Sequence, residues 1–261
     1  MHVVLHYLPL DLSGLQYADL HSRNISFQIP SLDSWTVEQI YKLFKEPRMK
    51  SVSRLDDQPL GSEVPPYTVE AAWPWNPRIE GLSDQVKIID FGEAFFSEEE
   101  ERKESNVPML LQPPESLFHE GIGLPADIWA LACTIFEVFG KRSLFEGFMP
   151  DPDAVILEMI STLGMLPDRW WSKWRNRSLY LLDDGTRKAN SISSPFDEPR
   201  PLALRVQKMR LNCNEQFVED SEQLTAEGAA GLHKVLASLL RYEESERATA
   251  EEVVNLIQRL L

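Results

Sequence analysis

The stretch QYADLHSRNISF, Gln16–Phe27, places an acid, a histidine and an asparagine directly before a strand-like run. The run NISFQIP, residues 24–30, is rich in apolar and β-branched residues and stops at a proline, which predicts a short strand. Asp19, His21 and Asn24 therefore lie in a loop at the mouth of this strand. A single aspartate or asparagine in a loop is usually a turn residue, so a function needs further residues to support it.

A second strand supplies a second acid. The sequence QVKIIDFGEAF predicts a strand over residues 85–90, with Asp90 at its end and a turn at Gly92. Two antiparallel strands joined by an insertion would carry Asp19, Asn24 and Asp90 to one edge. Phosphoryl transfer needs a carboxylate that orients the attacking hydroxyl, and oxygen ligands that hold magnesium on the nucleotide phosphates. Asp19 is the candidate for the first role, and Asn24 and Asp90 are the candidates for the second.

The composition limits the class of protein. The chain has 261 residues and is 43% hydrophobic, which is enough to bury one large core or two small ones. Its 41 acidic residues against 26 basic ones give a net charge of -15, which disfavours binding to nucleic acid and suits solubility or a basic partner.

The two cysteines and the apolar runs bear on the compartment. Cys133 and Cys213 are too few for a disulfide framework and lack metal-type spacing, so an intracellular location is expected, in the cytoplasm or the nucleus. The longest apolar run, residues 128–140, falls well short of the roughly 20 residues that a spanning helix needs. No basic region precedes an apolar one at the N-terminus, so neither membrane association nor an export signal is predicted.

Loops and short strands are expected in the first part of the chain, and helices in the remainder. Residues 1–16 are consistent with the end of an amphipathic helix and its exit turn. From residue 30 to about 85 the chain has several prolines and little periodicity, which indicates an ordered surface insertion. Pro125 is expected at the start of the first long helix, Gly140 just past its end, and a Thr249–Glu252 capping box at the last. Helices are predicted over residues 125–139, 153–164, 226–241 and 249–261.

Five segments, in order along the chain, resemble the large, C-terminal lobe of a protein kinase. YADLHSRN resembles the catalytic loop H-R-D-L-K-x-x-N, and DFG at residues 90–92 is unaltered. PPE at residues 113–115 stands where kinases have A-P-E, and DIWALA from Asp127 resembles the helix whose aspartate braces the catalytic loop. Arg247 resembles the arginine that pairs with the A-P-E glutamate, here Glu115, so a buried or half-buried ion pair between these two residues is expected.

The resemblance implies a fold, a reaction and a set of site residues. The fold is a mainly α kinase-like large lobe with a short β-hairpin, one domain over residues 1–261 with the insertion at about 30–85. The implied reaction is ATP-dependent phosphoryl transfer to protein serine or threonine, with ATP and Mg2+ as cofactors. The implied catalytic residues are Asp19 and His21, the metal ligands are Asn24 and Asp90, and the nucleotide-binding residues are Asn24, Ser26, Ile89 and Asp90.

Two further stretches resemble one particular group of protein kinases. The segment from Ser53 to Phe95, including the insertion and the DFG strand, looks like that of fungal kinases similar to SR-protein kinases, which phosphorylate Arg/Ser-rich splicing factors. ISTLGMLPDRWWSKW, residues 160–174, is similar to the corresponding region of the same group. The resemblance therefore implies a protein substrate that is Arg/Ser-rich, which an acidic chain would suit.

The catalytic loop departs from the kinase pattern at several positions. Tyr17 and Ala18 replace the usual His and Arg, so phosphorylation of the activation loop is not expected to switch this chain. His21 replaces a lysine that helps to neutralise the transferring phosphate, and an imidazole supplies less positive charge than an ammonium near neutral pH. Ser26 stands where many kinases have an apolar residue under the adenine, so nucleotide affinity is expected to be reduced.

The small lobe of a kinase has no counterpart in the sequence given. Only 18 residues precede Asp19, too few for a glycine-rich loop, a strand lysine and a helix glutamate. The first reading is therefore a truncated kinase that is weak or inactive alone. The alternatives are a pseudokinase that binds a basic partner, and a small-molecule phosphotransferase of the aminoglycoside type, which shares D-L-H-x-x-N. Aminoglycoside-type phosphotransferases would not be expected to have PPE, DIWALA and the late arginine, here Arg247, as well.

Overall fold

A computed structural model describes residues 14–29, 32–72, 83, 85–98, 102–147, 149–188, 198–212 and 224–258. The helix end predicted within residues 1–16 lies almost entirely outside the described residues, and so does Cys213. The chain divides into two compact units, a large one of Met1–Ser26 with Lys87–Leu261 and a smaller one of Phe27–Val86.

Helices dominate the large unit, which confirms the prediction of a mainly helical fold. Among its described residues, no helix is both long and apolar enough to cross a membrane. The α-helices are α2 (Pro114–Leu117), α3 (Leu124–Gly140), α4 (Pro152–Leu163), α5 (Asp168–Lys173), α6 (Arg177–Tyr180), α7 (Leu202–Asn212), α8 (Ala226–Leu239) and α9 (Ala250–Gln258), and the 3-10 helices are η1 (Ser22–Asn24), η3 (Met109–Leu111) and η4 (Glu244–Glu246).

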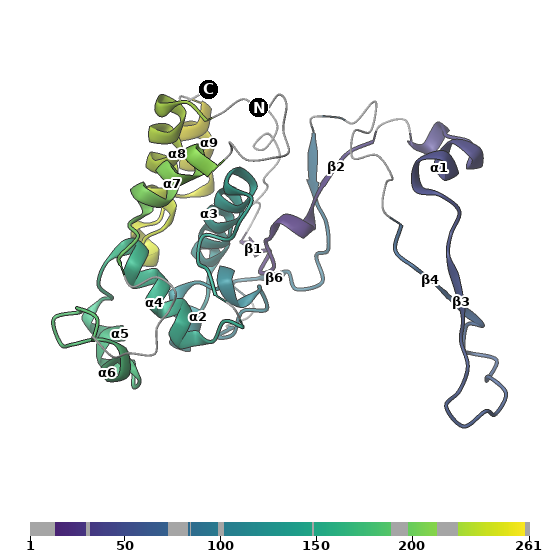
Figure 1. Ribbon diagram of the computed structural model, residues 1–261, viewed down its shortest axis with the longest axis horizontal. Helices are drawn as coiled ribbons and strands as arrows, with labels where there is room; N and C mark the ends of the chain where they lie inside the picture. The colour runs from purple at the N-terminus through teal and green to yellow at the C-terminus, as the bar shows by residue number, and fades with distance from the viewer. Residues whose placement is uncertain are drawn as a thin grey trace. The chain divides into compact units, whose positions relative to one another are not determined.

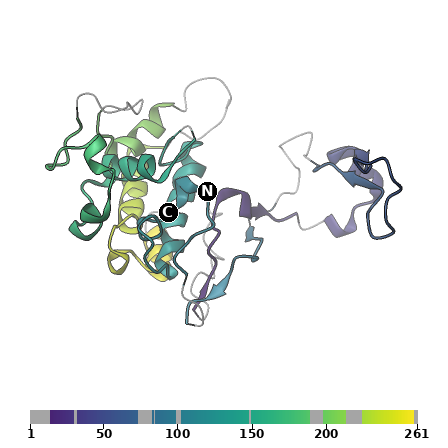
Figure 2. The same ribbon diagram turned by 90° about the horizontal axis from the view of Figure 1, so that it is seen from below.

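Helix α3 is the centre of the large unit. Trp129, Leu131 and Phe136 of this helix are almost wholly buried, in one hydrophobic cluster with residues of α7 and α8. Figures 1 and 2 both show α3 beside the α7–α8–α9 group, in agreement with the contacts between these helices. Burial of this apolar surface is the main stabilising contribution to the unit, because each large apolar side chain removed from water contributes roughly 1.5–3 kcal/mol.

Two short strand pairs lie near the N-terminal loop. Strand β1 (Leu15–Gln16) pairs antiparallel with β6 (Phe95–Phe96), a pairing that the sequence did not predict. Strand β2 (Ile25–Phe27) pairs with β5 (Val86–Ile88), which confirms the expected pairing of the two strands. Both strands are shorter than predicted. In particular, β5 stops before Asp90 because that residue adopts a left-handed backbone with φ 61°, which a strand cannot contain.

The smaller unit contains helix and strand where little periodicity was expected. Its elements are η2 (Leu32–Ser34), α1 (Val37–Phe44), and the antiparallel pair β3 (Met49–Ser51) and β4 (Tyr67–Val69). A reciprocal capping box starts α1: Thr36 accepts from the Gln39 N–H and Gln39 accepts from the Thr36 N–H. Among the described residues of this unit none is buried, so its short elements are held by local hydrogen bonds.

Three predicted helices start close to the expected residues. Helix α4 begins after Asp151, whose carboxylate caps the Ala154 N–H at 2.8 Å, and ends before Gly164 at φ 93°. The predicted capping box of α9 is confirmed: the Thr249 N–H donates to Glu252 Oε2 at 2.8 Å, and the Glu252 N–H donates to Thr249 Oγ1 at 3.3 Å. Helix α8 ends two residues earlier than predicted, at Leu239.

The predicted role of Gly140 was wrong. Gly140 is the last residue of α3 rather than the residue past its end, and Lys141 takes the left-handed conformation at φ 52°. A Cβ atom at Gly140 would lie 2.9 Å from Cε of Met209 in α7. The end of the Met209 side chain would have to shift to admit a larger residue, so glycine at this position lets α7 pack closely against α3.

The predicted Glu115–Arg247 ion pair is confirmed. Arg247 Nη1 donates to Glu115 Oε1 at 2.7 Å and Nη2 donates to Oε2 at 2.6 Å, with the two side chains 0% and 1% exposed. Arg247 also donates to the carbonyls of Pro125 and Arg241. This pair ties α2 to the start of α3 and to the segment before α9.

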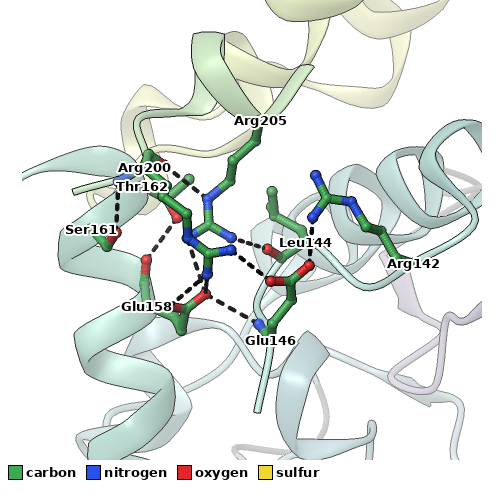
Figure 3. Close-up of polar contacts among 8 residues, drawn as sticks. All are labelled: Arg142, Leu144, Glu146, Glu158, Ser161, Thr162, Arg200 and Arg205. Carbon is green, nitrogen blue, oxygen red and sulfur yellow. Dashed lines mark hydrogen bonds and ion pairs between the residues drawn. The ribbon is translucent and has the colours of Figure 1, made fainter. Parts of the chain in front are cut away.

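A second buried acid–arginine cluster joins the exit of α3 to α4 and α7, and the sequence did not predict it (Figure 3). Glu158 in α4 accepts from Arg200, from Arg205 in α7 and from the Glu146 N–H, at 2.9–3.2 Å. Glu146 in turn accepts from Arg200 and Arg142, each at 2.6 Å. Arg205 also donates to the Leu144 carbonyl at 2.6 Å. The bonds that Arg200 and Arg205 make to Glu158 and Leu144 thus join residues 42–61 positions apart in the sequence.

Candidate active site

The N-terminal loop is fixed to α3 by one carboxylate. Asp127 Oδ2 accepts from the Tyr17 N–H at 2.7 Å, and Oδ1 accepts from the Ala18 N–H at 2.9 Å. Ala18 adopts a left-handed φ of 64°. The bracing of this loop by Asp127 is therefore confirmed. Burial raises the pKa of Asp127 to about 6, although the two N–H bonds favour its charged form.

Asp19 and Asn24 are directly bonded. Asn24 Nδ2 donates to Asp19 Oδ2 at 3.0 Å and to the Asp19 carbonyl at 3.1 Å. Asn24 is buried at the end of η1, and its N–H donates to the His21 carbonyl at 3.0 Å. His21 Nε2 lies 3.6 Å from Asp19 Oδ1. The three polar residues of the opening stretch are thus brought together around the Asp19 carboxylate.

Asp90 is carried to this loop by the backbone. The Ile89 N–H donates to the Asn24 carbonyl at 3.0 Å, so Asp90 directly follows a residue that is paired with Asn24. Asp90 is exposed, and its Oδ1 accepts from the Gly92 N–H at 3.4 Å. Asp90 therefore lies one residue beyond the backbone contact with Asn24.

Tyr17 contributes contacts that the sequence analysis missed. Its hydroxyl donates to the Ile89 carbonyl, and its ring meets the Phe91 ring edge-on at a centroid distance of 5.1 Å. Burial, and then the nearby Asp19 carboxylate, raise the pKa of Tyr17 to about 12, so the hydroxyl keeps its proton. The sequence does contain a signal for this contact: Tyr17 stands two residues before Asp19. From that position its side chain can hydrogen-bond to the backbone just before Asp90.

Ser26 and Ile89 are less informative. Ser26 is half-buried in β2, two residues after Asn24, and Ile89 is 44% exposed just beyond β5. Both lie in the large unit. Ile89 contributes its N–H to Asn24 and its carbonyl to Tyr17, so its backbone links the two segments.

The oxygen atoms present suit magnesium. Asn24 uses its amide nitrogen as the donor to Asp19, which leaves its amide oxygen as an acceptor. The Asp90 carboxylate is exposed and adds further oxygen donors, and Mg2+ prefers oxygen ligands, including one or two carboxylates together with substrate phosphates. Within the described part of the chain, no group of three or more His, Cys, Asp or Glu side chains could hold a metal ion alone.

A large part of the chain matches a known protein family. Residues 79–256 match the family model of the protein kinase domain. The chain is 28% identical over 176 residues to the serine/threonine-protein kinase SKY1 of Saccharomyces cerevisiae, an alignment that covers 66% of this chain and 21% of that protein. It is 25% identical over 174 residues to the human dual specificity protein kinase CLK2, covering 66% of this chain and 31% of CLK2.

One alignment includes nearly the whole chain. The meiosis induction protein kinase IME2/SME1 of Saccharomyces cerevisiae is 27% identical over 266 residues, which covers 97% of this chain and 37% of the relative. The chain thus spans between 21% and 37% of the length of these three relatives. Because the kinase model matches more than half of its residues, this chain belongs to the protein kinase family.

Proposed function

We propose that this chain is the large lobe of a serine/threonine protein kinase of the SR-protein-kinase-like group, with an insertion at about residues 30–85. The observation that carries the proposal is the 3.0 Å hydrogen bond between Asn24 Nδ2 and Asp19 Oδ2. It joins the carboxylate proposed to orient a hydroxyl to a proposed ligand of magnesium.

Each site residue has a separate proposed role. Asp19 orients the hydroxyl of the protein substrate and accepts its proton, and Asn24 and Asp90 hold Mg2+ through their side-chain oxygens. Bound magnesium would neutralise developing charge on the nucleotide phosphates. His21, 3.6 Å from Asp19, lies beside the proposed position of the transferred phosphoryl group.

ATP is the proposed nucleotide, with Ser26 and Ile89 next to its base. Ser26 presents a hydroxyl where an apolar surface would favour the adenine, and His21 supplies less positive charge than a lysine would. We therefore expect residues 1–261 to bind Mg-ATP weakly and to transfer phosphate slowly by themselves.

The proposed substrate class is Arg/Ser-rich protein. The net charge of -15 supports it, because an acidic surface attracts a basic partner and speeds its association. An intracellular location, in the cytoplasm or the nucleus, stays a prediction.

The proposal is tested by measuring Mg2+-dependent ATP binding with titration calorimetry. Transfer of phosphate from radiolabelled ATP to an Arg/Ser-repeat peptide is measured in parallel. Asn24→Ala and Asp90→Ala should each weaken ATP binding by at least ~10-fold. Loss of a residue that merely orients a metal ligand already weakens metal binding about 10-fold or more, and loss of the ligand itself should weaken it at least as much. Asp19→Ala should preserve binding and lower transfer by roughly 10²–10³-fold. The matched control is Asp183→Ala, which removes an exposed aspartate from another part of the large unit. ATP binding that is unaffected by Asp90→Ala would refute the metal assignment.

A second candidate, a non-catalytic module that binds a basic partner, is favoured by the environment of Asp19. One Asp19 oxygen accepts from Asn24 and the other lies near His21, so both oxygens already have a neighbour. In that case the same titrations should find no Mg2+-dependent ATP binding, while an Arg-rich peptide still binds.

A further inference from the structure

A pocket of about 480 Å³ lies in the large unit. It is lined by the end of α4, the turn that follows, the start of α7, the second half of α8 and the segment 241–247, which includes η4. Its volume falls within the roughly 300–1,000 Å³ that is typical of ligand sites, which combine an apolar lining with a few polar groups. No residue proposed above for catalysis, magnesium or ATP lines it, so the proposed reaction leaves this pocket without a role.

The pocket has an apolar floor and one exposed apolar wall. Leu166, Leu202 and Leu240 line it and are only 3–5% exposed, so they form its floor. Met165 lines it too but is 44% exposed. A Cβ atom at Gly185 would collide with the end of the Met165 side chain, so the glycine lets this side chain rest against the turn at residues 182–185. Covering Met165 and the floor with a large apolar group would remove apolar surface from water, which favours such a ligand.

The segment 241–247, which forms the polar edge of the pocket, is fixed at two points. Arg247 Nε donates to the Arg241 carbonyl at 2.9 Å, which closes the segment on itself. The Tyr242 hydroxyl donates to the Gly164 carbonyl at 2.8 Å, which holds the segment to the turn after α4. The backbone that carries the polar edge is therefore preformed, and a ligand that binds there loses little affinity to ordering of the protein.

Two exposed charged residues of this segment have no partner. Arg241 and Glu246 line the pocket, and neither side chain makes a hydrogen bond or an ion pair within the described part of the chain. Glu243, the other acid at this edge, is already bonded to Arg169 of α5. Apart from His233, the pocket thus offers one free positive and one free negative charge, in a chain whose net charge is -15. A ligand of one sign of charge would meet a like charge here, whereas a ligand with both signs would pair twice.

We propose that this pocket docks an extended peptide segment of a partner protein, in which one large apolar residue stands between an acidic and a basic residue. Side chains of an extended peptide alternate between its two faces, so every second residue points the same way. The apolar residue lies on the floor beside Met165, the acid two positions away pairs with Arg241, and the base two positions away on the other side pairs with Glu246. The inference does not depend on the proposed reaction, because no residue of the candidate active site takes part in it.

The test measures binding of labelled peptides to residues 1–261 by fluorescence anisotropy. Two mixed peptides with capped ends have the sequences Glu-Ala-Leu-Ala-Arg and Arg-Ala-Leu-Ala-Glu. Three comparison peptides contain glutamate at both charged positions, arginine at both, or alanine in place of the central leucine.

The protein variants are Arg241→Glu, Glu246→Arg, the double variant with both exchanges, and Met165→Ala. Because the Arg241 and Glu246 side chains are exposed and unpaired within the described residues, their exchange should leave the thermal unfolding midpoint unchanged. The matched controls are Arg175→Glu and Glu251→Arg, at exposed positions of the large unit that do not line the pocket.

One of the two mixed peptides should bind most tightly, because only one direction of the peptide brings both of its charges to their partners. Arg241→Glu and Glu246→Arg should each weaken its binding by roughly fivefold, as expected for one exposed ion pair. The double variant should instead prefer the mixed peptide of the opposite order, a result that a loss of folding cannot produce. Met165→Ala should weaken the leucine peptides and not the alanine peptide, and the control variants should change neither the affinity nor the preferred order.

The inference would be overturned by equal binding of the two mixed peptides, by an unchanged order preference in the double variant, or by no saturable binding of any peptide. Tightest binding of the peptide with two arginines would make the pocket a site for basic segments instead. Displacement of the bound peptide by free leucine would assign the pocket to a small zwitterion, and the docking of a partner protein would then be wrong.

Discussion

Glu115 and Glu158 are both buried carboxylates bonded to arginine, yet they differ in how many cations they contact. Among the described residues, Glu115 has one arginine partner, Arg247, and both side chains of this pair are almost fully excluded from water. Glu158 has two arginine partners, Arg200 and Arg205, in a cluster whose edge is partly open to solvent. The first site is a single pair and the second is a redundant network.

The number of cations around a buried carboxylate decides how much stability is lost when one of them is removed. Breaking a buried pair leaves an uncompensated buried charge, and this is why the loss is large even where the intact pair contributes little net stability. In a network, the remaining charges can still neutralise the one that is left. The two sites should therefore respond unequally to the same kind of substitution.

The largest effect is expected at the single pair. Arg247→Met leaves the Glu115 carboxylate buried without a cation and removes the donors to the Pro125 and Arg241 carbonyls. Glu115→Gln removes the carboxylate that accepts from both Nη atoms of the buried Arg247. Each should lower the free energy of unfolding by about 3–5 kcal/mol, measured by urea denaturation. The double variant should lose less than the sum of the two, and unchanged stability in both single variants would contradict the comparison.

A third buried carboxylate, which has no cation bonded to it among the described residues, extends the comparison. Asp127 accepts two backbone N–H groups and has its pKa raised by burial to about 6, above the ordinary value of 3.8. Because the folded state holds the proton more tightly than the unfolded state, this group contributes stability below about pH 4. That contribution is lost as the pH rises to 6 and above. A shift of this size corresponds to up to about 3 kcal/mol.

The measurement is the unfolding free energy at pH 4, 5, 6 and 7 for the original chain and for Asp127→Asn. The original chain should lose stability relative to the variant between pH 4 and 6, because an amide does not titrate. Using the difference between the two proteins cancels the other acids. A constant difference across this range would mean that Asp127 remains charged in the folded state.

The smallest effects are expected in the network. Arg200→Gln leaves Glu158 bonded to Arg205 and the Glu146 N–H, and leaves Glu146 bonded to Arg142, so a loss of about 1–2 kcal/mol is expected. Arg142→Gln removes a partly exposed arginine at the edge and should cost at most about 0.5 kcal/mol. Thermal unfolding monitored by circular dichroism would rank both variants. A loss at Arg200 as large as that at Arg247 would show that the network is not redundant.

Local signals made part of the fold predictable from sequence. The capping box of Thr249 and Glu252, the glycine after α4 and the apolar spacing of α3 act within a few residues, so they can be recognised without a partner. Helix α1 also has a local signal, a capping box at Thr36. It was missed because the helix has eight residues and lies in a stretch where several prolines hide the periodicity.

The candidate site was predictable as a set of residue types, and less so as a geometry. Asp19, Asn24 and Asp90 were named because phosphoryl transfer requires a carboxylate and oxygen ligands in that order. Their roles remain predictions. The bond from Asn24 to Asp19, and the hydroxyl contact of Tyr17 with Ile89, depend on how the loop is braced against α3.

The sequence by itself determined the helical character of the chain, its kinase family and the identity of the Glu115–Arg247 partners, through motifs that carry their own spacing. Only the tertiary structure decided that Glu158 meets Arg200 and Arg205, that β1 pairs with β6, and that Gly140 makes room for Met209. The physical reason is the distance along the chain over which each interaction acts. Caps, turns and helical periodicity are settled within one or two turns of chain. The partner of a buried charge or a tightly packed glycine depends instead on segments that only the packed core brings together.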